Sequence, residues 1–125
     1  MIRRHYIKRR PRKNDKPGMR AAYKQAHPEC ACCHTDGREP MNHLELAHIL
    51  GGRFGRRDAN CNFLCLCREC HHERLIGKSQ LSWYLTLKAE LGELDREGLQ
   101  AIIARCGTTY ILPDAILVPP TLRGR

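Results

Sequence analysis

The chain has 125 residues, enough for one compact domain with additional tail segments but too few for two independent hydrophobic cores. Only 42% of the residues are hydrophobic and 6% are aromatic, so a small core would need support from something besides burial. The formal net charge of +9 favours an acidic polymer as partner, and no apolar run approaches the length needed to cross a membrane.

Most of the positive charge lies in residues 1–20, which we expect to form a flexible basic arm. This segment holds nine basic residues and one acidic residue, so it carries +8 of the net +9. Pro11, Pro17 and Gly18 disfavour a continuous helix through it. A block of this kind can be a solubilising tail, but contact with a phosphate backbone explains it better. The candidate contacts in the arm are Arg9, Arg10, Arg12 and Lys13.

The elements that follow the arm predict a small α+β domain over residues 21–78. Residues 20–27 favour a short helix, which the next residue, a proline, ends. The alternating pattern of residues 44–49 predicts a strand that carries His48 and stops at two glycines. Apolar residues within 60–66 indicate a second short strand.

The last third of the chain is predicted to be helical and then extended. Ser79 is expected to cap a helix, and Asp95 a further helix that ends at Gly107. In the first of these helices, apolar residues recur every three or four positions, and we interpret them most simply as core residues. They are Leu81, Tyr84, Leu87, Leu91 and Leu94. Residues 79–107 therefore form a helical extension, and residues 108–125, which contain three prolines, an extended tail.

The cysteines predict a structural zinc site. No apolar segment typical of a secretion signal follows Met1, so we expect the reducing cytoplasm, where disulfides are disfavoured. Two CxxC pairs, Cys30/Cys33 and Cys67/Cys70, supply the four thiolates that close a tetrahedral zinc site. His34 and His72 are substitute ligands that these four cysteines make unnecessary. Cys32 is ambiguous, because it could replace Cys33 in a tighter knuckle. The cysteines expected to be small buried side chains are Cys61, Cys65 and Cys106.

The function is expected in the insertion between the two CxxC pairs. Its 33 residues exceed the length found in a simple zinc ribbon. Within it, residues 45–72 resemble the motif of the HNH, or ββα-metal, endonucleases, and the resemblance extends over residues 30–77. The matching residues are His48, Gly51, Gly52, Asn62, and the run from Cys67 to His71.

The resemblance implies a small ββα-metal finger, clamped by the four-cysteine zinc site, with a helical C-terminal extension. It also implies that His48 is the general base, that Asn62 braces the loop that orients it, and that His71 opens a short helix. His71 would bind a catalytic divalent ion, Mg²⁺, Mn²⁺, Ni²⁺ or Zn²⁺, separate from the structural zinc. These residue types suit the chemistry, because cutting a phosphodiester needs a base for water and a cation for the phosphate.

Two positions depart from the HNH pattern. Many members have Asp or His immediately before the base as a metal ligand, whereas this chain has Ala47. Some members also have a second histidine one helical turn after the one that matches His71, where this chain has Leu75. His43 and Asp58 are the candidate replacements, although the motif supports neither position.

Two hypotheses follow from the sequence. The first is metal-dependent hydrolysis of DNA, with RNA as the alternative substrate, in which backbone contacts give low sequence specificity. The candidate contacts in the body of the protein are Arg53, Arg56 and Arg57. The second is a catalytically inactive zinc module that binds nucleic acid or a partner assembly, and its main support is Ala47 and Leu75.

Overall fold

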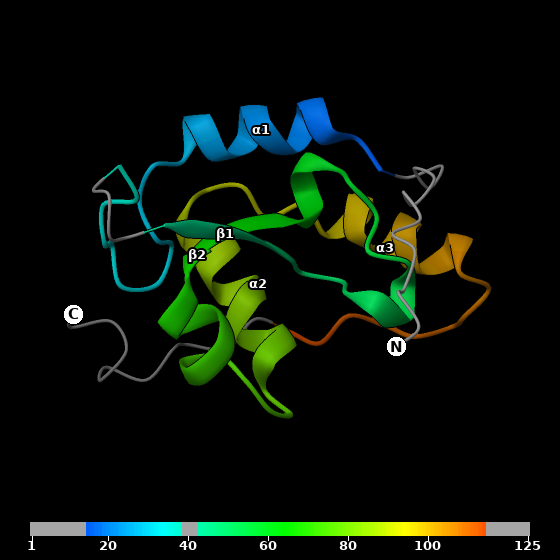
Figure 1. Cartoon of the computed structure of the whole chain (residues 1–125). Coiled ribbons are helices and arrows are strands. Elements are labelled where there is room, and N and C mark those ends of the chain that lie inside the picture. Colours follow the sequence, from blue (N-terminus) through cyan, green and yellow to red (C-terminus); the bar gives the residue numbers. More distant parts are fainter. Residues whose placement is uncertain (1–14, 39–42, 115–125) are drawn as a thin grey trace, which may run out of the picture.

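The computed structural model describes residues 15–38 and 43–114, and in these ranges the chain forms a two-stranded antiparallel sheet with helices around it (Figure 1). The elements in chain order are α1 (Pro17–Ala26), β1 (Leu44–His48), the 3₁₀ turns Gly52–Phe54 and Asn60–Asn62, β2 (Phe63–Cys67), a helical turn (Cys70–Arg74), α2 (Gln80–Glu90) and α3 (Arg96–Arg105). The predicted α+β class is confirmed. Within the two ranges, no helix has both the length and the apolar character needed to cross a lipid bilayer.

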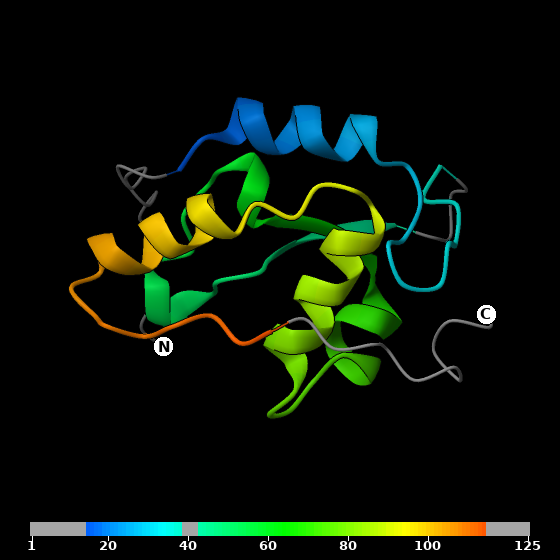
Figure 2. The same cartoon turned by 180° about the vertical axis from the view of Figure 1, so that it is seen from behind.

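The two strands form the centre of the core. They pair from Leu44 opposite Cys67 to His48 opposite Phe63, so the catalytic candidate lies at the end of the hairpin next to the start of β2. Phe63, Leu64 and Leu66 of β2 are fully buried. α1 runs along the hairpin, and α2 and α3 lie behind it in Figure 1 and in front of it in Figure 2. This cover explains why β2 is apolar on both faces.

Two helix boundaries differ from the prediction. α1 begins at Pro17 rather than at residue 20, because proline suits the first turn of a helix, so the end of the expected arm is helical. α2 ends at Glu90 rather than near Leu94, and Gly92 follows with a φ of 73°, which favours glycine. The predicted cap of α3 is confirmed, since the Asp95 side chain accepts a hydrogen bond from the Gly98 N–H at 2.9 Å.

A buried lysine joins the first helix to the second. The side chain of Lys88, on α2, is 1% exposed, and its Nζ atom donates to Tyr23 Oη, Asn60 O and Glu93 Oε1 at 2.8–3.0 Å. His27 also contacts Glu93, with Nε2 2.6 Å from Oε2. Burial alone would raise the pKa of Glu93, but the hydrogen bonds from Lys88 and its other partners lower it to about 2. The protein thus supplies three acceptors for the Lys88 ammonium group, and these contacts fix α1 against α2.

The expected arm contacts Arg9, Arg10, Arg12 and Lys13 lie outside the described residues, as does most of the expected tail from 115 onward.

Candidate metal centre and active site

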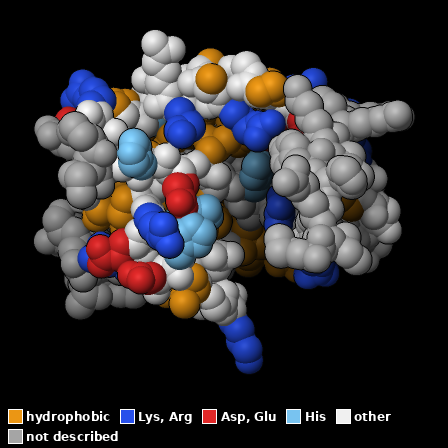
Figure 3. All heavy atoms as spheres, in the orientation of Figure 1, with side chains coloured by type: hydrophobic (Ala, Val, Ile, Leu, Met, Phe, Trp, Pro, Cys, Tyr) orange, Lys and Arg blue, Asp and Glu red, His pale blue; other side chains and the backbone are white. Residues whose placement is uncertain are grey.

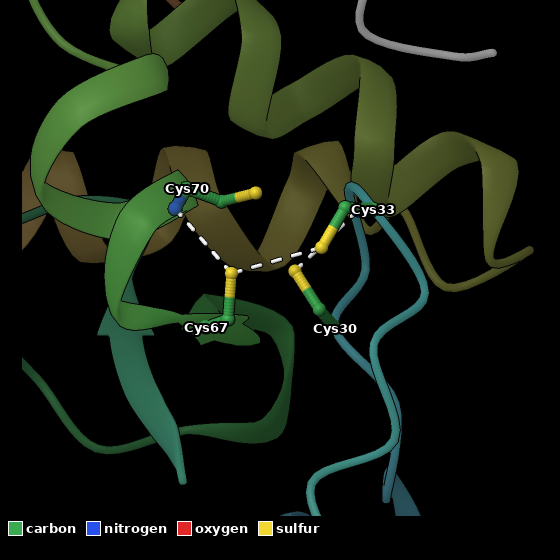
Figure 4. A group of neighbouring side chains, drawn as sticks. All are labelled: Cys30, Cys33, Cys67 and Cys70. Atoms are coloured by element: carbon green, nitrogen blue, oxygen red, sulfur yellow. Dashed lines mark hydrogen bonds between the residues drawn. The ribbon is translucent and has the colours of Figure 1, made fainter. Parts of the chain in front are cut away.

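The four cysteines of the two CxxC pairs come together in one group. Cys30 and Cys33 lie on the turn after α1, and Cys67 and Cys70 lie at the end of β2 and the start of the following helical turn (Figure 4). The four Sγ atoms all lie within 4.8 Å of one another, and Cys33 and Cys67 are 3.7 Å apart. This group could hold a metal ion.

The geometry of the group fits a tetrahedral ion bound by thiolates. Sulfur atoms about 2.3 Å from a central zinc lie about 3.8 Å apart, close to the Cys33–Cys67 separation. The backbone N–H of Cys33 donates to Cys30 Sγ at 3.5 Å, and that of Cys70 donates to Cys67 Sγ at 3.4 Å. Arg74 Nη1 lies 3.6 Å from Cys70 Sγ, where its positive charge would offset the negative charge of thiolates bound to an ion.

The remaining cysteines differ in burial. Cys65 is buried as expected, and Cys32 is buried next to the group but is not a member of it. Cys61 is only half-buried, and the prediction that Cys106 is buried is wrong, because its residue is exposed. Cys106 follows the last residue of α3, and its Sγ atom donates to Phe54 O at 3.4 Å.

His48 is held by a buried carboxylate. Its Nε2 atom lies 2.8 Å from Asp58 Oδ1, and the side chains of His48 and Asp58 are 17% and 2% exposed. Because a carboxylate can only accept, the imidazole carries its proton on Nε2 when neutral, and Nδ1 keeps a free lone pair. Among the described residues, no group donates to Nδ1. This arrangement fixes the tautomer of His48 and leaves Nδ1 able to accept a proton.

Asp58 is itself surrounded by donors. The Lys16 N–H donates to Oδ2 at 2.6 Å, and Arg20 Nε lies 2.9 Å from the same oxygen as an ion pair without the alignment of a hydrogen bond. Burial by itself would raise the pKa of Asp58, but the hydrogen bonds from His48 and Lys16 and the charge of Arg20 outweigh it and hold the pKa below its ordinary value. Asp58 is therefore ionised at neutral pH.

Asn62 connects the two ends of the loop between the strands. Its Oδ1 accepts from the Leu50 N–H at 2.7 Å, and its Nδ2 donates to Leu50 O at 3.2 Å and to Arg57 O at 2.9 Å. The side chain is fully buried, so these bonds are shielded from water. They fix the backbone on either side of the loop that carries Asp58.

His71 and His72 share one carboxylate. Glu45 Oε1, on β1, lies 2.8 Å from His71 Nδ1 and 2.6 Å from His72 Nε2. The side chains of His71, Glu45 and His72 are 25%, 37% and 54% exposed. Burial by itself would raise the pKa of Glu45, but the hydrogen bonds and charges of His71 and His72 together outweigh it and hold the pKa below the ordinary value. This group is a second set of ligand atoms within 4.8 Å of one another.

The candidate base and the candidate ion ligand border the same cavity, of about 600 Å³. His48 and Asp58 line it together with His71, His72 and Arg20, and the glycines at 51 and 52 form part of its wall. On the face drawn in Figure 3, histidine side chains lie beside acidic and basic ones below α1. The cavity is therefore open to solvent, and both acidic and basic side chains line it.

The three arginines of the loop are placed differently. Arg56 is exposed and borders the cavity. Arg53 is also exposed, but its guanidinium lies over the rings of Phe54 and Tyr110, 5.2 and 5.1 Å from their centres. Arg57 is half-buried. Of the three, only Arg56 lines the cavity that His48 also lines.

Two partners in the site were not predicted from the sequence. The sequence suggests Asp58 only as a metal ligand and indicates no role for Glu45. Strand and loop geometry, which short motifs do not encode, brings both side chains to the histidines. His43, the other suggested replacement, is exposed and borders a different hollow, with Lys24 and Arg38.

Core side chains occupy the two positions that depart from the HNH pattern. Ala47 is 1% exposed and Leu75 is 0% exposed, so neither position offers a ligand or a place for one. Comparisons with protein-family models, with curated proteins and with solved structures found no match for this chain.

Proposed function

We propose that this chain is a metal-dependent endonuclease of the HNH kind, which hydrolyses DNA phosphodiester bonds with His48 as the general base. The observation that carries the proposal is the hydrogen bond from His48 to the buried Asp58, in a cavity that His71 also lines. A histidine of fixed tautomer, beside a possible ion ligand and basic side chains, is what hydrolysis of a phosphodiester requires.

In this proposal His48 removes a proton from water. Nδ1 accepts the proton, and the imidazolium that results is stabilised by the charge of Asp58 at 2.8 Å. Asp58 stays ionised throughout and acts as a positioning residue. Asn62 keeps the loop in place through its three hydrogen bonds, so the base and its partner stay aligned.

Basic side chains at the cavity would hold the phosphate. Arg20 and Arg56 both line it, and Arg53, Arg57 and the arm would bind the backbone on either side. A divalent ion held by His71 would offset the charge that develops on the phosphate. By resemblance to the family, the products would carry a 5′-phosphate and a 3′-hydroxyl.

We assign a structural zinc ion to the four-cysteine group. Four thiolates leave no open position for a substrate, and the group joins the turn after α1 to the end of β2. Metal analysis of the purified protein should give one zinc per chain in this group. Cys67→Ser should lower that content and the thermal stability together.

The alternative function is a catalytically inactive zinc module that binds nucleic acid or a partner assembly. The burial of Ala47 and Leu75 favours it, because both positions lack the ligands that many HNH enzymes have. Both functions predict binding that weakens steeply with salt, so an affinity measurement does not separate them.

A plasmid-nicking assay separates the two. Wild-type protein is incubated with supercoiled DNA and Mg²⁺, Mn²⁺ or Ni²⁺, alongside His48→Ala and the matched control His43→Ala, which changes an exposed histidine outside the cavity. We expect nicking by the wild type and the control, and none by His48→Ala. A single-stranded RNA of matched length, tested in parallel, decides between the two nucleic acids.

The proposal fails if the wild type cuts neither substrate with any of the three ions, or if His48→Ala cuts as fast as the wild type. In the first case, retained binding would favour the inactive module. In the second case, another group would have to be the base.

A further inference from the structure

We infer that Glu45, His71 and His72 form a binding site for one divalent transition-metal ion, distinct from the four-cysteine group. Two imidazoles and one carboxylate have ligand atoms within 4.8 Å of one another. Glu45 and His72 lie at positions where the HNH resemblance assigns no ligand, so the site is a property of this chain. The inference concerns ion binding and does not require that the protein cuts DNA.

The distances suit an ion with little rearrangement. Ligand atoms about 2.1 Å from an octahedral ion lie about 3.0 Å apart. The Glu45 oxygen is 2.8 Å from His71 Nδ1 and 2.6 Å from His72 Nε2, so these separations need to lengthen by only about 0.2 and 0.4 Å. Small side-chain rotations supply such changes. An ion would replace the two hydrogen bonds with bonds to the same three side chains.

The elements that carry the ligands restrict their positions. Glu45 lies on β1, where it pairs with Leu66 of β2, and the two histidines are neighbours on the helical turn that follows β2. The four-cysteine group includes Cys70, the residue before His71, and so anchors the start of that turn. The histidine rings lie with centres 4.4 Å apart. Folding of the hairpin thus brings the carboxylate to the imidazoles without the help of the ion.

The ligand types select the class of ion. Two imidazole nitrogens and one carboxylate oxygen suit Zn²⁺, Ni²⁺, Co²⁺ or Mn²⁺, whereas Mg²⁺ prefers a set of oxygens only. With three protein ligands, further positions on the ion remain for water or a phosphate oxygen. His71 and His72 line the cavity that also contains His48, so those positions would face the place where the proposed reaction occurs.

The site would explain how the chain compensates for Ala47. The HNH pattern puts an ion ligand immediately before the base, but here that side chain is buried and apolar. Glu45, two residues earlier on β1, supplies a carboxylate in its place. This last step rests on the proposed function, whereas the ion site itself does not.

Titration calorimetry of the full chain with Ni²⁺ tests the site. The protein is used with its cysteine-bound zinc, and zinc content is measured before and after each titration. We expect one Ni²⁺ to bind the wild type without displacing zinc, and the affinity to fall at least tenfold in both Glu45→Gln and His72→Ala. The matched controls, Glu69→Gln and His43→Ala, change an acid and a histidine outside the group and should bind as the wild type does. Mg²⁺ at the same concentration should give no binding heat.

The inference is overturned if the wild type binds no Ni²⁺ beyond its zinc, or if Glu45→Gln and His72→Ala bind it as tightly as the wild type does. In either case the two short contacts are hydrogen bonds only. Binding of Mg²⁺ with equal affinity would overturn the assigned ion class. If the wild type binds Ni²⁺ as expected but cuts no nucleic acid, the ion site stands and the proposed function fails. Thermal melting with and without Ni²⁺ shows that each variant is folded.

Discussion

Replacing Asp58 by asparagine should disable the candidate base while leaving the protein folded. The Asp58 carboxylate is 2% exposed and serves three groups: His48 Nε2 at 2.8 Å, the Lys16 N–H at 2.6 Å and Arg20 Nε at 2.9 Å. Asparagine has the same shape but one acceptor oxygen and no charge, so it cannot satisfy all three. If its oxygen keeps the Lys16 N–H, its NH₂ group faces His48. The imidazole then carries its proton on Nδ1, which can no longer accept one from water.

The size of the effect can be worked out for activity and for stability. Loss of general-base catalysis commonly costs about 10²–10⁴ in rate, so we expect nicking by Asp58→Asn to fall at least about 100-fold. A hydrogen bond to a charged group contributes about 1.5–3 kcal/mol to stability. The side chains of Arg20 and His48 are 39% and 17% exposed, so water can replace part of what is lost. We therefore expect the free energy of unfolding to fall by about 1–2 kcal/mol.

The stability difference should also depend on pH. The pKa of Asp58 is lower in the folded state than its ordinary value, so its carboxylate stabilises the fold above that ordinary value. This contribution is lost as the pH falls through the lower, folded pKa. The gap between wild type and Asp58→Asn in urea denaturation should shrink below about pH 4.

The matched control is Asp36→Asn. Asp36 also pairs with an arginine, Arg38, but its side chain is 37% exposed and lies outside the cavity, so neither the nicking rate nor the urea midpoint should change. The reasoning is refuted if Asp58→Asn nicks at the wild-type rate and has the wild-type midpoint at pH 7. A loss of stability without loss of activity would show that Asp58 supports the fold but does not position His48.

Three further predictions concern other parts of the molecule. A chelator that removes the cysteine-bound ion should unfold the chain, because binding of structural zinc contributes about 10–16 kcal/mol and the total stability of a small domain is about 5–15 kcal/mol. An unchanged melting curve by circular dichroism would contradict this. In urea denaturation, Glu93→Gln should lower the free energy of unfolding by about 3 kcal/mol and Lys88→Met by about 1–2 kcal/mol, because only Glu93→Gln leaves a buried charge without its counter-ion. The opposite order would refute the proposed lysine network. Arg56→Ala should reduce the slope of log binding constant against log salt by about 1 in a fluorescence titration with DNA, and an unchanged slope would exclude a phosphate contact.

The sequence by itself determined the features that depend on local spacing. The two CxxC pairs predicted one group of four thiolates, and the structure brings their sulfur atoms together. Strand alternation placed β1 to within a residue, and Asp95 was recognised as the cap of α3. Such features follow from residues a few positions apart, because a turn, a strand and a helix cap each have a short repeat.

Only the tertiary structure decided which side chains complete the site. Asp58 reaches His48 because the loop held by Asn62 folds back over the end of β1. Glu45 reaches His71 because the strand pairing sets β1 beside the end of β2. These contacts join residues 10 and 26 positions apart, and their geometry depends on loop conformation and register, which carry no periodic signal in the sequence. The burial of Lys88 could not be predicted from the sequence for the same reason, since its partners come from α1 and from the segments that flank β2 and α2.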